Sequence, residues 1–420
     1  MSKIKVLTLS DHPLSPSGVG TQTRYICEAL LKTGRYEIIS LGGAIKHQDY
    51  RPVQVEPYAE DWRIIPVDGY GSHDMIRSVL RNEKPDILWF MTDPRFWGWL
   101  WEMENEIRPL CPMVYYHVWD NFPTPLFNRP FYISNDHIAT ISKVTDQIVR
   151  EAAPEVDRTY IPHAVNPNIF KPCTDAQKKE LRTHSLVEAD RDKVFFFWNN
   201  RNARRKHSGT LIWWFKEWLD KEKLHDKAAL IMHTEPNDPH GQDLEHIIER
   251  LGLGERQIML STSKVSPENL AAMYNMVDCT INISDAEGFG LATLESLSCG
   301  TPIIANMTGG LQEQVTDGTD WFGIGLFPTS KAIIGSQQVP YIYEDRTDKK
   351  QFHSALSKIY KMGEKNRKEL GQKGREHVDR HYSFQGFESK WVTLMDQVVE
   401  KHSSWKNRKE HNGITFKEVA

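Results

Sequence analysis

The sequence predicts an α/β protein made of two Rossmann-like, doubly wound domains. Short strands rich in β-branched and aromatic residues alternate with segments of helical period, and this alternation occurs twice along the chain. A proline-punctuated segment and a polar stretch separate the two series near residue 172. A length of 420 residues is sufficient for two to three domains with sizeable cores.

The first series, residues 1–172, is expected to form one doubly wound domain. Its apolar runs are nearly continuous, as in parallel strands that are buried on both faces. Helical segments between them include Thr21–Leu31, Met75–Asn82 and Val144–Ala152. The expected strands are Lys5–Ser10, Glu37–Leu41, Arg63–Val67, Ile87–Met91, Met113–His117 and His137–Ile141.

The second series, residues 173–382, repeats this alternation and is expected to form the second domain. After Asp348 the apolar spacing is helical throughout, and residues 383–420 are expected to form a last helix over Ser383–Glu400 and a polar tail that frays. The expected strands of this domain are Val194–Trp198, Ala229–Met232, Ile258–Leu260, Cys279–Ile283 and Pro302–Ala305.

The composition excludes several classes of function. The 52 lysines and arginines balance 56 aspartates and glutamates, so no global field attracts nucleic acid. Five scattered cysteines without a C-x-x-C pair suit a reducing compartment and predict no structural zinc site. The chain shows neither an export signal nor a run of about 18 apolar residues. We therefore expect a cytoplasmic protein without a transmembrane segment.

The densest motif of the chain covers residues 284–302 and is expected to form a strand, a glycine-loosened turn and a helix. Gly288 and Gly290 flank Phe289 and allow a ligand to approach the backbone closely. The free N–H groups of the first helical turn then suit a diphosphate. Glu287 precedes this helix and Glu295 lies about one turn inside it, so the two carboxylates are able to contact different parts of one extended ligand.

This stretch resembles family 4 of the retaining glycosyltransferases of GT-B architecture, whose signature is E-x7-E in an EGFGLxxLE-like segment. Glu287 and Glu295 match its two glutamates, and Gly309 to Glu313 match its GG-x-x-E element. The resemblance implies that Glu287 is catalytic and holds hydroxyls of the transferred sugar, and that Glu295 binds the ribose of the donor. It also implies that the amides of Phe289, Gly290 and Leu291 bind the phosphates. In the implied architecture the two domains face each other across a cleft, and the last helix crosses back to the first domain.

A basic loop follows the first strand of the second domain. Arg201 and Lys206 match, at the same offset, the G-R-x-x-x-x-K-G element with which the resembled family neutralises its diphosphate, although Asn200 and His207 replace the usual glycines. A leaving diphosphate requires positive charge where its own charge develops. Arg204 and Arg205 are instead expected to be solvated.

Two further positions lie in the first domain. The P-S-G-V-G-T loop lacks the third glycine of a dinucleotide fingerprint, but in the resembled family it reaches the donor phosphates, so Gly18 and Gly20 are candidate contacts. His117 ends a strand at the edge where open α/β sheets bind ligands. The resemblance makes His117 a catalytic candidate that faces the sugar, and a hydrogen-bonded structural histidine is the alternative.

Four other segments carry no assigned chemistry. The Asp190-Arg191-Asp192 sequence is expected to be a turn and not a metal site, because it precedes a strand instead of following one. His233–Pro236, the apolar stretch from Asp320 to Tyr343 and the aromatic run Phe96–Trp101 depart from the resembled family and are expected to influence substrate choice. The tryptophan-rich helices are expected to bury their aromatic faces, because no basic stripe accompanies them.

Together these features predict a retaining, metal-independent glycosyltransferase that needs no cofactor. Its donor is a nucleotide-diphosphate sugar, and its acceptor is a sugar, glycan, lipid or protein. A nucleotide-sugar epimerase or a phosphorylase of the same two-domain fold is the alternative, and a sugar-binding protein with an idle site is a third possibility. The donor base, the sugar, the acceptor and the oligomeric state are not encoded in any motif of the chain.

Overall fold

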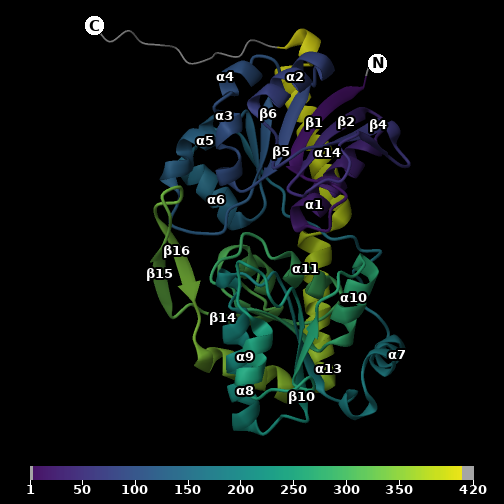
Figure 1. Cartoon of the computed structure of the whole chain (residues 1–420), viewed down its shortest axis with the longest axis vertical. Coiled ribbons are helices and arrows are strands. Elements are labelled where there is room, and N and C mark those ends of the chain that lie inside the picture. Colours follow the sequence, from purple (N-terminus) through teal and green to yellow (C-terminus); the bar gives the residue numbers. More distant parts are fainter. Residues whose placement is uncertain (1–2, 409–420) are drawn as a thin grey trace.

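The computed structural model describes residues 3–408, and its two large sheets, both mainly parallel, lie one above the other in Figure 1. The expected α/β fold is confirmed. The polar tail from residue 409 onward lies outside the described residues.

The first sheet has eight strands in the order β3-β4-β2-β1-β5-β6-β7-β8, all parallel except the β3–β4 pair. Its strands are β1 (Ile4–Asp11), β2 (Tyr36–Gly43), β3 (Val53–Val55), β4 (Ala59–Pro66), β5 (Ile87–Thr92), β6 (Met113–His117), β7 (His137–Thr140) and β8 (Arg158–Tyr160). The helices of this domain are α1 (Gly18–Leu31), α2 (His73–Glu83), α3 (Gly98–Trp101), α4 (Glu104–Ile107), α5 (Arg129–Ile133) and α6 (Lys143–Ala152).

The second sheet is wholly parallel, in the order β11-β10-β9-β12-β13-β14. Its strands are β9 (Val194–Asn199), β10 (Ala228–His233), β11 (Ile258–Ser261), β12 (Cys279–Asn282), β13 (Ile303–Asn306) and β14 (Gly323–Leu326). The accompanying helices are α7 (Asp175–Ser185), α8 (Ser208–Glu222), α9 (Leu244–Arg250), α10 (Pro267–Met276), α11 (Leu291–Ser298), α12 (Gln312–Val315) and α13 (Lys349–His381).

The last helix, α14 (Phe384–His402), returns to the first domain, as expected (Figure 1). The Arg35 guanidinium forms two hydrogen bonds of 2.8 and 2.9 Å with the Asp396 carboxylate, and the ring of Trp391 lies 5.9 Å from that of Trp89 on β5. One hydrophobic cluster therefore contains α1, α14 and one face of the first sheet, and it continues into the β9, α10 and α11 side of the second domain.

The apolar stretch before α13 forms a hairpin of β15 (Ser330–Ile334) and β16 (Ile342–Arg346). In Figure 1 it extends along one side of the molecule from the second domain toward the first. Asn121 Nδ2 donates to the carbonyl of Tyr343 at 2.6 Å, so β16 contacts the loop that follows β6. The sequence pattern did not predict this hairpin, because its side chains are largely half-exposed and show no buried period.

The other expected structural roles are also visible. Asp190 lies at the end of a 3-10 turn, buried, and pairs with Arg256 and Lys193, so it stabilises the fold. Trp97, Trp101 and Trp218 are buried in the cores, whereas Trp213 on α8 is 48% exposed, so the expected burial of the tryptophans holds only in part. All five cysteines are free thiols. Among residues 3–408, no helix combines the length and the apolar character that crossing a bilayer requires.

Candidate active site

The E-x7-E segment lies at the carboxyl end of β12 and forms the turn and helix that its sequence predicts. Gly290 adopts a φ of +91°, and a Cβ atom there would lie 2.5 Å from Leu311 Cδ2. Helix α11 begins directly after it without a capping side chain. The N–H groups of its first turn are therefore available to an anionic ligand.

Two helix N-termini meet at this point. Gly18 is the first residue of α1, and a Cβ atom on Gly18 would lie 2.9 Å from Cδ1 of Leu291, the first residue of α11. At Gly20 a Cβ atom would lie 2.6 Å from the carbonyl oxygen of His12. The tight loop before α1 therefore leaves no room for a side chain at this position. The positive ends of both helix dipoles thus point toward the same region between the domains.

Glu287 lies in front of α11 and is held by two cations. Lys206 Nζ forms an ion pair with Glu287 Oε2, and the two side chains are only 9 and 13% exposed. Arg205 Nη1 lies 3.9 Å from the same oxygen and donates to the carbonyl of Ala286 at 2.7 Å. Burial raises the pKa of Glu287, but the charges of Lys206 and Arg205 outweigh it and hold this pKa below its ordinary value.

Glu295 occupies a different environment, one turn inside α11. Its Oε2 accepts a hydrogen bond of 2.7 Å from the Tyr274 hydroxyl, which in turn accepts one of 2.9 Å from Asn199 at the end of β9. Burial raises the pKa of Glu295 to about 7, although the hydrogen bond from Tyr274 opposes this shift. The two glutamates of the motif therefore differ in charge state near neutral pH.

The basic loop is arranged differently from the expectation. Lys206 reaches Glu287 as expected, but Arg201 is 61% exposed and forms two hydrogen bonds with Asp238, at 2.6 and 3.1 Å. The expectation that Arg205 is solvated is wrong. Residues 204–206 form a 3-10 turn, which points successive side chains in different directions. Arg205 therefore turns toward Asp120 and Glu287, while Arg204 pairs with Glu344 of β16.

His117 is fully buried beneath the first sheet's carboxyl edge. Its Nε2 lies 2.9 Å from the Tyr132 hydroxyl, and burial lowers its pKa to about 3. This placement corresponds to the alternative of a hydrogen-bonded structural histidine. A second histidine, His163, lies between the domains, with its Nδ1 2.8 Å from the Tyr116 hydroxyl and its ring 4.9 Å from that of Phe289. His163 was not among the candidate residues predicted from the sequence, because no motif of the chain marks it.

Glu313, from the GG-x-x-E element, joins the two domains. Its Oε2 accepts a hydrogen bond of 2.7 Å from the backbone N–H of Lys143 at the start of α6, and its Oε1 accepts one of 2.7 Å from the Tyr160 hydroxyl. The Tyr382 hydroxyl, just before α14, donates to Oε1 at 3.3 Å. A single buried carboxylate thus connects the second domain, the first domain and the returning C-terminal segment.

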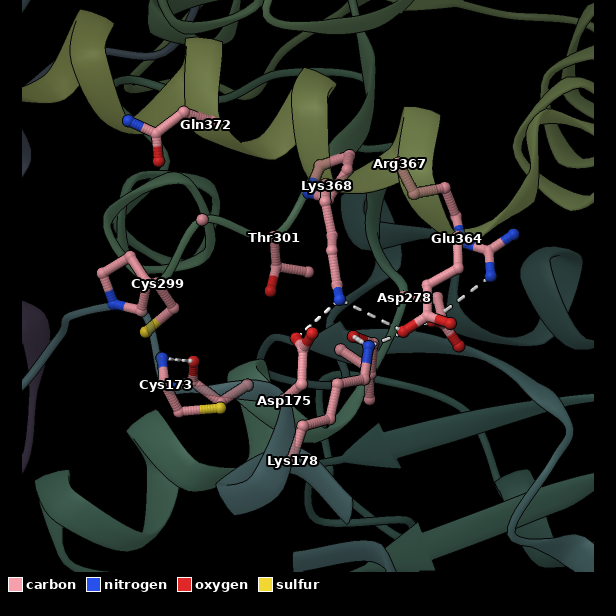
Figure 2. A pocket seen from close by; sticks show the side chains of 15 residues that line it. Cys173, Asp175, Lys178, Asp278, Cys299, Thr301, Glu364, Arg367, Lys368 and Gln372 are labelled. Carbon is pink, nitrogen blue, oxygen red and sulfur yellow. Dashed lines mark hydrogen bonds and ion pairs between the residues drawn. The ribbon is translucent and has the colours of Figure 1, made fainter.

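A cavity of about 170 Å³ lies away from the E-x7-E segment and its partners, where the start of α7 meets α13 (Figure 2). The predicted site residues do not line it. Its charges are paired with one another: Lys368 contacts Asp175 at 2.5 Å and Glu364 at 3.4 Å, and Lys178 contacts Asp278 at 3.0 Å (Figure 2). These pairs anchor α13 beside the segment that connects the domains.

Part of the chain is similar in sequence to known glycosyltransferases. Residues 179–377 match the family described as glycosyl transferases group 1, which confirms the resemblance for this part of the chain. D-inositol 3-phosphate glycosyltransferase from Corynebacterium jeikeium is 30% identical over 182 residues, which cover 41% of this chain and 42% of that protein. A GDP-mannose-dependent alpha-(1-6)-phosphatidylinositol monomannoside mannosyltransferase from Mycolicibacterium smegmatis is 27% identical over 191 residues, 44% of this chain and 47% of that protein. The matches thus span less than half of either relative.

Solved structures resemble the chain over nearly its whole length. Sucrose-phosphate synthase from Thermosynechococcus elongatus aligns with a TM-score of 0.75 at 16% identity, covering 95% of this chain and all of that one. HepE from Anabaena, solved in complex with UDP, aligns with a TM-score of 0.67 at 14% identity, covering 94% of this chain and all of that one. At this level of identity the likeness establishes the fold, and the fold is that of GT-B glycosyltransferases.

Proposed function

We propose that the protein is a retaining, metal-independent glycosyltransferase that moves a sugar from a nucleotide-diphosphate sugar to an acceptor. The observation that carries the proposal is the meeting of the N-termini of α1 and α11 at Gly18 and Leu291, beside the Lys206–Glu287 ion pair. Helix N-termini and buried cations favour a polyanion, and a carboxylate beside them accepts hydrogen bonds from sugar hydroxyls.

Each part of the site has a role in this reaction. The diphosphate binds against the backbone amides of Phe289, Gly290 and Leu291 at the start of α11, and against the Gly18–Gly20 loop. Lys206 and Arg205 stabilise the negative charge that develops on the leaving diphosphate, as fixed charges do most effectively in a partly buried site. Glu287 orients the transferred sugar, and Glu295 accepts a hydrogen bond from the ribose.

Arg201 and His117 have supporting roles in this proposal. Arg201 is 61% exposed but its partner Asp238 is only 9% exposed, so for Arg201 to reach the diphosphate a largely buried carboxylate has to give up its cation. His117 supports the carboxyl end of β6 through its contact with Tyr132, unless the sheet edge rearranges on donor binding and turns the ring toward the sugar.

A nucleotide-sugar epimerase, a phosphorylase and an idle sugar-binding protein are the competing functions. A labelled donor incubated without acceptor separates the first from a transferase, because an epimerase changes the sugar without releasing nucleotide. A phosphorylase instead requires inorganic phosphate, and an idle site binds the donor without turnover.

The decisive experiment combines binding and turnover. A thermal-shift panel of UDP-, GDP- and ADP-sugars identifies the donor, because a ligand that binds only the folded state raises the melting temperature. With that donor, Glu287→Ala and Lys206→Ala are each expected to abolish transfer while the fold is retained. Lys179→Ala, an exposed lysine on α7, is the control and is expected to behave as the wild type. Undiminished transfer in both site variants contradicts the proposal.

The cytoplasm is the proposed location, and the five free thiols are compatible with its reducing conditions. The proposed partners are the nucleotide-sugar donor and an acceptor bound on the first-domain side, without nucleic acid and without a bound cofactor.

A further inference from the structure

A small cavity lies where the C-terminal segment passes from the second domain to the first. Its volume is about 120 Å³, and it shares no lining residue with the cavity of Figure 2. A volume well below the roughly 300 Å³ of a small-molecule site accommodates one small charged group and not a whole nucleotide. The end of α13, the start of α14 and the segment after β8 form its walls, which include Pro162, Arg380, His381, Tyr382, Ser383 and Lys390.

The cavity collects positive charge. Among the described residues that line it, three are basic and none is acidic. Arg380 and His381 belong to the last turn of α13, and Lys390 lies in the second turn of α14. Within residues 3–408 none of the three forms an ion pair, and the acidic residues nearby in the chain, Asp379 and Glu388, are both paired with other cations. The cavity therefore has no counter-charge of its own.

Lys390 stands in a position that favours an anion beside it. Its Nζ lies 5.5 Å from the centre of the Tyr160 ring, and burial lowers its pKa below the ordinary value, with no described carboxylate to oppose the shift. Its side chain leans toward the N-terminus of α14, which carries partial positive charge. Ser383 Oγ accepts the N–H of Gly386 at 3.2 Å, but the two N–H groups before it have no partner within the helix.

Tyr382 connects this cavity with the candidate active site. Its hydroxyl donates to the backbone carbonyl of Glu313 at 3.1 Å and to Oε1 of the same residue at 3.3 Å. Its ring lies 6.0 Å from that of Phe289, in the turn before α11. One wall of the cavity therefore contacts both the carboxylate that joins the domains and the turn that holds the diphosphate in the proposed function.

We propose that this cavity binds the phosphate group of a small phosphorylated molecule, and that the bound phosphate fixes the crossing between the domains. Arg380 offers a planar guanidinium for two phosphate oxygens, Lys390 a point charge and His381 a ring N–H. Arg380 is part of α13, which is bonded to α11 of the second domain, whereas Lys390 is part of α14, which is bonded to the first. A dianion between these two cations attracts both domains to the arrangement seen here.

The consequence for donor binding rests on the proposed function. In this arrangement the N-termini of α1 and α11 lie together, so a diphosphate between them and a phosphate in the cavity favour the same domain positions. Two ligands that favour one state raise each other's affinity by the same factor. We therefore expect the nucleoside diphosphate of the donor to tighten phosphate binding in the cavity severalfold.

Calorimetric titration of inorganic phosphate at constant ionic strength tests the site. Arg380→Gln and Lys390→Gln are each expected to weaken binding about tenfold, because each removes a hydrogen bond to a charged group. Lys206→Ala removes a cation of the proposed donor site and should retain phosphate binding in the cavity. Lys373→Ala, an exposed lysine earlier on α13, is the control for general loss of charge and should bind as the wild type does.

The outcomes separate this inference from the proposed function. No phosphate binding, equal weakening in Lys373→Ala, or loss in Lys206→Ala with retention in both cavity variants overturns the inference. Equal phosphate affinity with and without the nucleoside diphosphate overturns the coupling between the sites. The proposed function is judged by donor binding and transfer alone, and the phosphate titration of the free protein still decides the cavity if no donor binds.

Discussion

The guanidinium group of Arg205 in the second domain lies 3.0 Å from the carboxylate of Asp120 in the first, and the same arginine extends to within 3.9 Å of Glu287. One side chain therefore connects the loop that holds the proposed donor with the loop that faces the acceptor. Its pair with Asp120 depends on the two domains lying close together.

Arg205→Ala should lower turnover by roughly 100-fold, because removing one fixed donor to developing charge typically costs that much. Arg201→Ala should change turnover only a few-fold, since Arg201 is 61% exposed and paired with Asp238. Steady-state kinetics of the two variants decide the order. A larger loss in Arg201→Ala than in Arg205→Ala would instead support the expectation from the sequence, in which Arg201 is the second diphosphate cation.

Donor binding should depend on pH through Glu295. Burial raises the pKa of this carboxyl from 4.5 to about 7, so it is largely protonated in the folded protein just below neutrality. Between pH 4.5 and 7 the Glu295 carboxyl is protonated in the folded state and ionised in the unfolded state. Proton binding therefore stabilises the folded state at low pH, and this stabilisation is lost as pH rises through 7. In the proposed function the carboxylate that forms accepts a ribose hydroxyl, so nucleotide affinity should rise over the same range. Titrations from pH 5.5 to 8.5 should show this rise in the wild type, whereas a persistent rise in Glu295→Gln would assign it to another group.

Gly309→Ala should unfold the site locally. Gly309 has a φ of +49°, and a Cβ atom there would lie 1.8 Å from the carbonyl oxygen of Glu287. The left-handed backbone alone costs about 1–2 kcal/mol for a non-glycine residue, and the clash adds to it. Gly318→Ala, at a φ of +98° with open space around the Cβ position, isolates the backbone cost. Denaturant melts and turnover measure both variants, and equal stability would show that the loop absorbs the clash.

Glu313→Ala should destabilise the contact between the domains. It leaves the Lys143 N–H and the Tyr160 hydroxyl without their acceptor, whereas the Tyr382 hydroxyl keeps the backbone carbonyl of residue 313, and each unsatisfied buried group costs about 1–3 kcal/mol. Glu313→Gln retains the shape and one carbonyl oxygen and should lose less. Small-angle scattering should show a larger radius of gyration for the alanine variant. An unchanged radius and melting temperature would mean that the hydrophobic cluster alone holds the domains together.

Turnover should be the same in EDTA as in magnesium. Lys206 and Arg205 already supply positive charge beside Glu287, so the leaving diphosphate does not require a metal ion to balance it. Initial rates with the donor identified by thermal shift, before and after chelation, test this expectation. Loss of activity in EDTA that magnesium restores would contradict it.

Much of the fold follows from local pattern. Runs such as residues 87–91 are apolar at every position because parallel strands are covered on both faces, and this signal marks the interior strands of both sheets. Short or edge strands lack it, so β3, β8, β14 and the β15–β16 hairpin were not predicted.

The chain by itself determined the order of strands and helices, the glycine-loosened turn before α11 and the identity of the two glutamates, because these depend on neighbours within one or two turns. Only the tertiary structure decided that Arg205 faces Glu287 while Arg201 faces Asp238, and that Asp120, His163 and Glu313 lie between the domains. Their partners are distant in sequence. Such contacts depend on how the two domains pack against each other, so no local or periodic sequence pattern indicates them.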